Sequence, residues 1–164
     1  MESRELSSKS GSLRKDQILG LDMATHTGYY CLSGSGIWNF TESRSRNGNK
    51  QHKAFRDTLI DFITRNGIRQ IVAEDISVNN HFTDIRKLSE FRGILLEVCD
   101  ELDLPEPEFV NVVTLKKFAT GNGKADKNEM MAACANRYRF QPRSHDEADA
   151  FFLYHYYCRK FRIF

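Results

Sequence analysis

Acidic residues that end buried apolar runs are the feature that most constrains this chain. Asp22 follows the apolar residues 18–21, and Glu74 follows the apolar residues 71–73. Asp146 and Asp149 stand one helical turn apart at the head of an aromatic-rich segment. A carboxylate at the end of a buried strand is costly unless a positive charge shares its site. Several such groups brought together would repel one another without a divalent cation between them, so the pattern indicates a metal-dependent enzyme.

The size and composition are those of one soluble globular domain. The chain has 164 residues, 40% of them hydrophobic and 28% charged. No apolar run approaches the roughly 20 residues that span a membrane, so no membrane partner is expected. Residues 1–15 are polar and are expected to form a flexible tail before a single domain at 16–164. The four cysteines are far apart among apolar neighbours, which favours buried free thiols in a reducing, cytoplasmic compartment.

The formal net charge of +2 does not by itself identify a partner. Basic residues recur along the chain, and the acids that balance them include the four suspected site residues. If a metal ion neutralised those four, the remaining surface would be basic and would suit a polyanion. A mixed, solvated surface is equally compatible with the charge alone.

Hydrophobic periodicity and turn residues predict the order of elements. Strands are expected at 17–22, 28–33, 36–40, 68–75 and 109–113, with a glycine-containing hairpin turn at Gly34–Gly36. Helices are expected after residue 49 up to Asn66, at 84–102, at 126–137 and from Ser144 onward, with a helical turn at 115–118. This order predicts an α/β fold, a mixed five-stranded sheet with helices on both faces. Asp22 and Glu74 then fall at carboxyl ends of strands, where open α/β sheets bind ligands.

Each acidic motif also has a plainer explanation. An aspartate that ends a strand, like Asp22, is often an ordinary turn residue. Glu74 and Asp75 point to opposite faces of a strand, and Glu74 is the chosen site residue because it ends the apolar run. Glu147 fits a capping box with Ser144, and acids in a first helical turn are often only dipole partners. His145 could be a ligand, a proton shuttle or a surface residue.

Four lysines surround a glycine-rich turn between residues 113 and 127. They are Lys116, Lys117, Lys124 and Lys127. Lysines in such a setting can hold phosphates, although the order of residues is not that of a P-loop. Taken alone, the segment could equally be a solvated loop.

Together these motifs resemble the RuvC-type Holliday junction resolvases of the RNase H-like superfamily, in particular phage-type members. The resemblance covers nearly everything from Ile18 to about Cys158. It is carried by the sequences Leu-Asp-Met-Ala-Thr-His-Thr-Gly-Tyr, Val-Ala-Glu-Asp-Ile, Leu-Lys-Lys-Phe-Ala-Thr-Gly-Asn-Gly-Lys-Ala-Asp-Lys and Asp-Glu-Ala-Asp-Ala. Each motif is weak alone, but four in order at suitable spacing are specific.

The resemblance assigns roles to individual residues. It implies that Asp22, Glu74, Asp146 and Asp149 are catalytic and hold two Mg²⁺ or Mn²⁺ ions. It implies that Lys116 and Lys127 assist at the scissile phosphate, and the predicted DNA contacts are these two with Lys117, Lys124, Phe82, Arg86 and Lys87. The chain departs from the family in having Met23-Ala24 after Asp22 where many members have Pro-Gly. It also has Ser77 where members carry a bulky wedge residue, a role that Phe82 would then take.

The function that the resemblance implies is a structure-selective DNA endonuclease. It would resolve four-way junctions by paired nicks that leave 5′-phosphate and 3′-hydroxyl ends. The family acts as a homodimer, and the apolar face of the helix at 84–102, with Phe91, Ile94 and Val98, is the candidate interface; the same face could instead pack on the sheet within one chain. The alternatives are a nuclease for other branched DNA or RNA·DNA hybrids, and a non-catalytic binding module. The phage-like first motif favours a viral or mobile-element origin.

Overall fold

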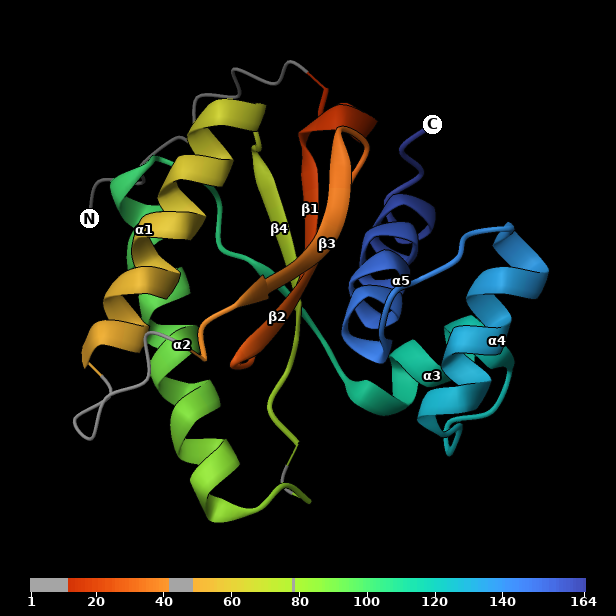
Figure 1. Ribbon diagram of the computed structural model, residues 1–164. Helices are drawn as coiled ribbons and strands as arrows, with labels where there is room; N and C mark the ends of the chain where they lie inside the picture. The colour runs from red at the N-terminus through yellow and green to blue at the C-terminus, as the bar shows by residue number, and fades with distance from the viewer. Residues whose placement is uncertain (1–11, 42–48, 78) are drawn as a thin grey trace, which may run out of the picture.

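A central mixed sheet carries helices on both sides in the computed structural model, which describes residues 12–41, 49–77 and 79–164 (Figure 1). The strands are β1 (Ile18–Asp22), β2 (His26–Cys31), β3 (Gly34–Asn39), β4 (Gln70–Glu74) and β5 (Glu108–Val110). The helices are α1 (Asn49–Asn66), α2 (Phe82–Glu101), α3 (Val112–Thr120), α4 (Lys127–Tyr138) and α5 (His145–Lys160), after a short 3-10 turn at Lys15–Gln17. The predicted α/β class and the five-stranded sheet are confirmed.

The strand order β3-β2-β1-β4-β5 places β1 at the centre of the sheet. β1 pairs antiparallel with β2 and parallel with β4, and β4 pairs parallel with β5. In the parallel pair, Gly20 lies opposite Val72 and Leu21 opposite Ala73. The next position along each strand is Asp22 and Glu74, so the two acids end neighbouring strands at the same edge of the sheet.

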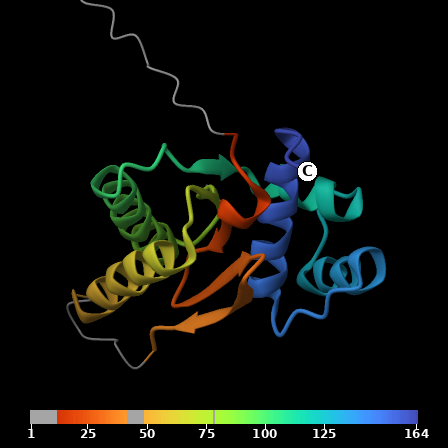
Figure 2. The same cartoon turned by 90° about the horizontal axis from the view of Figure 1, so that it is seen from above.

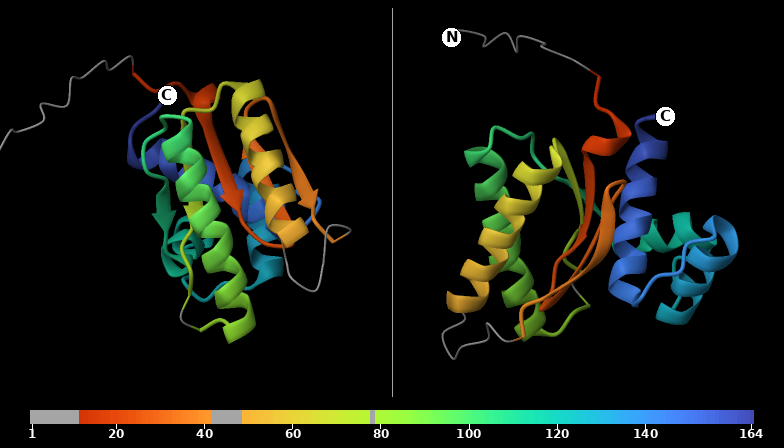
Figure 3. Two further views of the ribbon diagram at one scale, coloured as in Figure 1. Left: turned by 90° about the vertical axis from the view of Figure 1, so that its left-hand side faces the viewer. Right: turned by 45° about the horizontal axis from the view of Figure 1, so that its top comes forward.

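Two separate cores form because side chains alternate across the strands. Leu19, Leu21 and Ile71 pack with α1 and α2, whereas Ile18 and Val72 pack with α3, α4 and α5. Figures 2 and 3 show the pair α1 and α2 on one face of the sheet and α5 directly against the other. Because Asp22 and Glu74 follow Ile18 and Val72 at even spacing, both side chains lie on the α5 face.

The β2–β3 turn differs from the prediction. The turn is formed by Leu32 and Ser33, and Gly34 already pairs with Cys31 as the first residue of β3. The predicted turn at Gly34–Gly36 is therefore wrong, and both strands begin two residues earlier than expected. The glycines instead lie within the strand, where Gly36 accommodates the side chain of Arg143 from the loop before α5, as described below.

The segment after β5 is helical where a strand was predicted. Asn111 caps α3, because its side chain accepts a hydrogen bond from the backbone N–H of Val113 at 2.8 Å. The β-branched pair Val112 and Val113 favours a strand by propensity, but the asparagine cap starts a helix there. α3 replaces the single helical turn expected at 115–118.

The apolar face of α2 packs within the chain. Phe91, Leu95 and Val98 are fully buried, and Phe91 stacks on Phe55 of α1 with ring centroids 4.5 Å apart. Of the two alternatives for this face, packing within one chain is therefore confirmed for Phe91 and Val98, because the sheet and α1 already cover them, and these two side chains do not form a dimer interface. Ile94 is partly buried against the same core.

The predictions for the N-terminal tail and the cysteines can be compared with the described residues. The predicted tail lies outside the described residues for positions 1–11, whereas Leu13 packs on the α5-side core and Lys15 opens the 3-10 turn. All four cysteines are free and buried, as expected. No helix in the described part of the chain is long and apolar enough to cross a membrane.

Candidate metal centre

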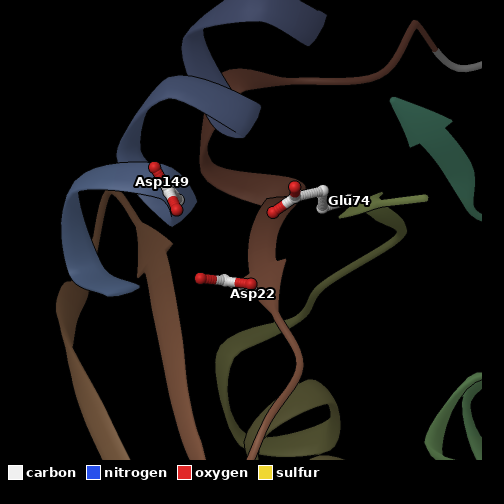
Figure 4. A group of neighbouring side chains, drawn as sticks. All are labelled: Asp22, Glu74 and Asp149. Carbon is white, nitrogen blue, oxygen red and sulfur yellow. The ribbon is translucent and has the colours of Figure 1, made fainter. Parts of the chain in front are cut away.

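Three carboxylates from distant segments converge at the carboxyl end of the sheet. Asp22 ends β1, Glu74 ends β4, and Asp149 lies in the second turn of α5. One oxygen from each lies within 4.8 Å of the others, and the three side chains point toward one another (Figure 4). A set of three carboxylates with no sulfur or imidazole donor suits a hard divalent cation such as Mg²⁺ or Mn²⁺.

Burial and mutual repulsion make this cluster unfavourable without a cation. Burial raises the pKa of Glu74 from its usual 4.5 to about 7 and that of Asp149 from 3.8 to about 8. The pKa of Asp22 is raised well above its usual range, first by burial and then by the charges of Asp149, Glu74 and Asp146. The raised pKa values mean that three adjacent negative charges are unfavourable here, and a bound cation would remove this cost.

Asp146 lies at the border of the cluster. Its charge and its hydrogen bond to Asp22 both raise the pKa of Asp22. Its side chain is 17% exposed and pairs with His145, with Nε2 and Oδ1 3.2 Å apart. Asp146 therefore borders the cluster but is not one of the three carboxylates whose oxygens lie within 4.8 Å of one another.

Two of the predicted lysines lie close enough to the acids for their charges to act on them. The charge of Lys116 on α3 opposes the rise in pKa of both Glu74 and Asp149, and the charge of Lys127 on α4 opposes that of Asp149. No such effect on the acids is seen for Lys117 or Lys124, which are exposed on the neighbouring surface. Lys116 is partly buried and Lys127 is exposed, so these two differ from Lys117 and Lys124 in the effect of their charges on the acids.

A pocket of about 560 Å³ opens over the acids. The first two turns of α2 contribute Asp84, Lys87 and Leu88 to its wall, opposite the residues that follow β1. Lys87 spans the pocket and donates a hydrogen bond to Thr25 Oγ1 at 3.0 Å. Phe82, at the start of the same helix, is 75% exposed, and Arg86 is exposed as well.

The structure adds pocket residues that the sequence analysis did not single out. Thr25 and His26 line the pocket; Thr25 belongs to the turn after Asp22, and His26 is the first residue of β2. Both residues lie in the first motif, Leu-Asp-Met-Ala-Thr-His-Thr-Gly-Tyr, and this position could have identified them from the sequence. Asn80, from the segment before α2, also lines the pocket, and no motif marked it.

Asp75 and Glu147 lie outside the three-acid cluster, although Asp75 lines the pocket above it. Asp75 is exposed, caps its own strand end by accepting from the Ile76 N–H at 2.9 Å, and lies 3.9 Å from Arg92. The predicted capping box is confirmed in one half, because Ser144 Oγ accepts from the backbone N–H of Glu147, but the Glu147 carboxylate does not return the bond to the N–H of Ser144. The Glu147 side chain is 2% exposed, and its carboxylate accepts from the backbone N–H of Arg143.

Glycines bring α5 onto the sheet closely enough to complete the site. A methyl group on Gly20 would lie 2.2 Å from the backbone oxygen of Ala150, and one on Gly28 would lie 2.0 Å from that of Asp146. Gly28 is paired with Asp22 across β1 and β2. The backbone of α5 therefore rests directly on these two positions, which sets the acids of α5 beside Asp22.

We expect the metal-free protein to lose stability as pH rises. The raised pKa values of Glu74 and Asp149 mean that the folded state binds protons that the unfolded state releases, so their contribution is full below about pH 4 and disappears as pH rises to about 8. The shift of Glu74 alone corresponds to a loss of about 3 kcal/mol, and that of Asp149 adds to it. Urea unfolding in EDTA across this range measures it. Asp149→Asn should flatten the curve and saturating Mn²⁺ should remove the loss, whereas identical curves for wild type and Asp149→Asn would contradict the coupled, buried cluster.

Solved structures with this arrangement of elements include Holliday junction resolvases. RuvC from Thermus thermophilus has a TM-score of 0.69 at 16% identity, with 88% of this chain and 96% of that chain covered. The same protein in complex with a Holliday junction substrate gives 0.70 at 17% identity, covering 87% and 94%. The yeast mitochondrial Holliday junction resolvase Ydc2 gives 0.60 at 11% identity, covering 90% and 85%.

No protein-family model and no curated protein sequence matches the chain. At identities of 11–17%, the likeness to the solved structures establishes the arrangement of the chain in space. Both RuvC structures match along nearly their whole length, so the agreement extends over the complete domain. The protein therefore has the RNase H-like fold of the RuvC-type resolvases.

Proposed function

We propose that this protein is a divalent-metal-dependent endonuclease that resolves four-way DNA junctions, with residues 16–164 as its nuclease domain. The observation that carries the proposal is the convergence of Asp22, Glu74 and Asp149 on one face of a fold shared with RuvC. One of the similar structures contains a Holliday junction substrate. The phage-like first motif extends the proposal to a phage or mobile-element origin.

The acids fit two Mg²⁺ or Mn²⁺ ions. Asp22, Glu74 and Asp149 offer oxygens within 4.8 Å of one another, and Asp146 adds a fourth carboxylate at the border. Bound ions would supply the Lewis acidity that activates water and stabilises the leaving 3′ oxygen. The four carboxylates would hold the ions. Because burial raises the pKa of Asp22, Glu74 and Asp149, their full ionisation would depend on the bound cations.

The lysines and α2 would bind the DNA backbone. Lys116 and Lys127 would contact the scissile phosphate, which is supported by the effect of their charges on the acids. Lys117 and Lys124 extend this basic surface. On the other side of the pocket, Lys87 and Arg86 would contact the opposite DNA arm, and the exposed Phe82 would insert at the junction.

Paired nicks require two active sites, so we propose a homodimer. The interface has to involve surfaces other than the buried side chains Phe91 and Val98. A dimer would let each copy cut one of two opposing strands. Sedimentation of the protein with and without junction DNA measures this assembly directly.

Comparison of four labelled substrates tests the specificity. The protein is incubated with a four-way junction, a flap, an RNA·DNA hybrid and a linear duplex of matched sequence, each in Mg²⁺ and in EDTA. We expect the junction to be cut at least tenfold faster than the others, and only with Mg²⁺. Equal or faster cutting of the flap or hybrid would replace junction resolution with another branched-DNA or hybrid nuclease. Loss of cutting on every substrate would favour a non-catalytic binding module.

A further inference from the structure

The buried carboxylate of Glu147 closes the loop before α5 into a defined turn. Glu147 Oε1 accepts a hydrogen bond from the backbone N–H of Arg143 at 2.9 Å, and Oε2 lies 3.5 Å from Arg143 Nη1. The backbone N–H of Glu147 also donates a hydrogen bond to Ser144 Oγ, at 3.4 Å. Because the Glu147 side chain is 2% exposed, its partners are these groups and little water.

The guanidinium of Arg143 also reaches the sheet. Its Nη1 donates a hydrogen bond to the backbone oxygen of Ser35 at 3.1 Å. The next residue, Gly36, leaves room for it, because a methyl group there would lie 2.8 Å from the same Nη1. One side chain thus links the first turn of α5 to β3, the strand at the edge of the sheet.

The turn held in this way carries two of the four acids of the metal centre. Successive residues of a helix are rotated by about 100°. Glu147 therefore points away from Asp146 and Asp149, toward the β2–β3 hairpin, when those two face Asp22. The backbone oxygen of Asp146 meanwhile rests on Gly28, the cross-strand partner of Asp22. The same orientation of α5 about its axis therefore directs Glu147 to Arg143 and directs Asp146 and Asp149 to the site.

We propose that the Arg143–Glu147 ion pair is a positioning device that fixes the first turn of α5 and with it the placement of Asp146 and Asp149 toward the metal ions. The inference rests on the proposed function. Neither residue lines the pocket above the acids, so both would act through the backbone of α5. Arg143 is 70% exposed and could alternatively contact DNA as one of the basic surface residues, and the two roles make different predictions.

Mn²⁺ titration calorimetry in the absence of DNA separates these roles. Wild type, Arg143→Gln, Glu147→Gln and the double variant are compared at one fixed pH. We expect each single variant to bind Mn²⁺ about tenfold more weakly, as is typical when a group supporting a metal ligand is lost. The double variant should bind no more weakly than either single variant, because both remove the same link. Junction cleavage should show a similar fall in kcat with KM for DNA within twofold.

Two controls make the test specific. Ile63→Val removes one methylene from the core on the opposite face of the sheet and is expected to lower stability while leaving Mn²⁺ affinity unchanged. Arg143→Lys keeps the positive charge but not the guanidinium fork, so it should restore DNA affinity if Arg143 contacts DNA and should leave Mn²⁺ binding weak if Arg143 positions α5.

The outcomes are distinguishable. Wild-type Mn²⁺ affinity in both Arg143→Gln and Glu147→Gln would overturn the inference and leave the proposed function intact. An equal loss in Ile63→Val would also overturn it, because the effect would then follow stability alone. Absence of Mn²⁺ binding by the wild type would overturn the inference and the proposed function together.

Discussion

Replacement of Asp22 by asparagine is expected to abolish cleavage while making the metal-free protein more stable. Asp22 is the carboxylate whose pKa is raised by burial and by all three of its acidic neighbours. Removing its charge removes repulsion within the cluster, so the free energy of unfolding in EDTA should rise by about 1 to 2 kcal/mol near neutral pH. Loss of a ligand that supplies about 4 kcal/mol of transition-state stabilisation should slow cleavage about a thousandfold.

A rise in the free energy of unfolding together with a fall in the cleavage rate is the result that tests this role of Asp22. Urea unfolding in EDTA gives the stability, and single-turnover junction cleavage in Mg²⁺ gives the rate. Asp75→Asn is the matched control, since Asp75 follows the same strand as Glu74 but is exposed and outside the cluster. It should change neither quantity appreciably. Parallel loss of stability and activity in Asp22→Asn would mean that the residue supports the fold and does not hold a metal.

Replacement of Gly28 by alanine is expected to be the most damaging change to the fold. The added methyl group would lie 2.0 Å from the backbone oxygen of Asp146 and 2.9 Å from the backbone nitrogen of Glu147. Backbone atoms of a packed helix cannot move aside as a flexible side chain can, so the start of α5 has to shift. The cost should be about 3 kcal/mol, and cleavage should fall by a factor of a hundred or more because Asp146 and Asp149 move with the helix.

Gly34→Ala provides the control in the same hairpin. A methyl group at Gly34 meets no atom within 4 Å. We expect its stability to remain within about 0.5 kcal/mol of the wild type and its cleavage rate to be unchanged. Thermal unfolding and the cleavage assay measure both variants. A Gly28→Ala protein as stable and active as Gly34→Ala would show that α5 can pack on the sheet in another way.

Local sequence patterns predict the parts of the site that lie on strands. Asp22 and Glu74 each end an apolar run, and the parallel pairing of β1 with β4 brings those two ends together. The choice of Glu74 over Asp75 follows from the alternation of side chains along a strand, and the structure places Glu74 in the cluster and Asp75 outside it. Asp149 joins them because Ser144 caps α5, as its sequence predicts, which puts Asp149 in the second turn of the helix.

Contacts between distant segments are what the sequence analysis could not provide. Gly28 reads as an ordinary strand glycine, and only the packed structure shows the carbonyl of Asp146 against it. The buried role of Glu147 depends on Arg143 and on the position of β3, neither of which is visible in the local pattern. At Val112, strand propensity was outweighed by the cap from Asn111, which shows how a single side-chain hydrogen bond can decide between two elements.

The most direct test of a metal-dependent junction resolvase is the ligation of its products. A four-way junction is incubated with the wild-type protein in Mg²⁺, the products are treated with DNA ligase, and the strands are sized with single-nucleotide accuracy. We predict two nicks at symmetric positions on opposing strands, with 5′-phosphate and 3′-hydroxyl ends that the ligase seals into linear duplexes. Unsealable ends, a single nick, or the same products from Asp22→Asn or in EDTA would contradict this account.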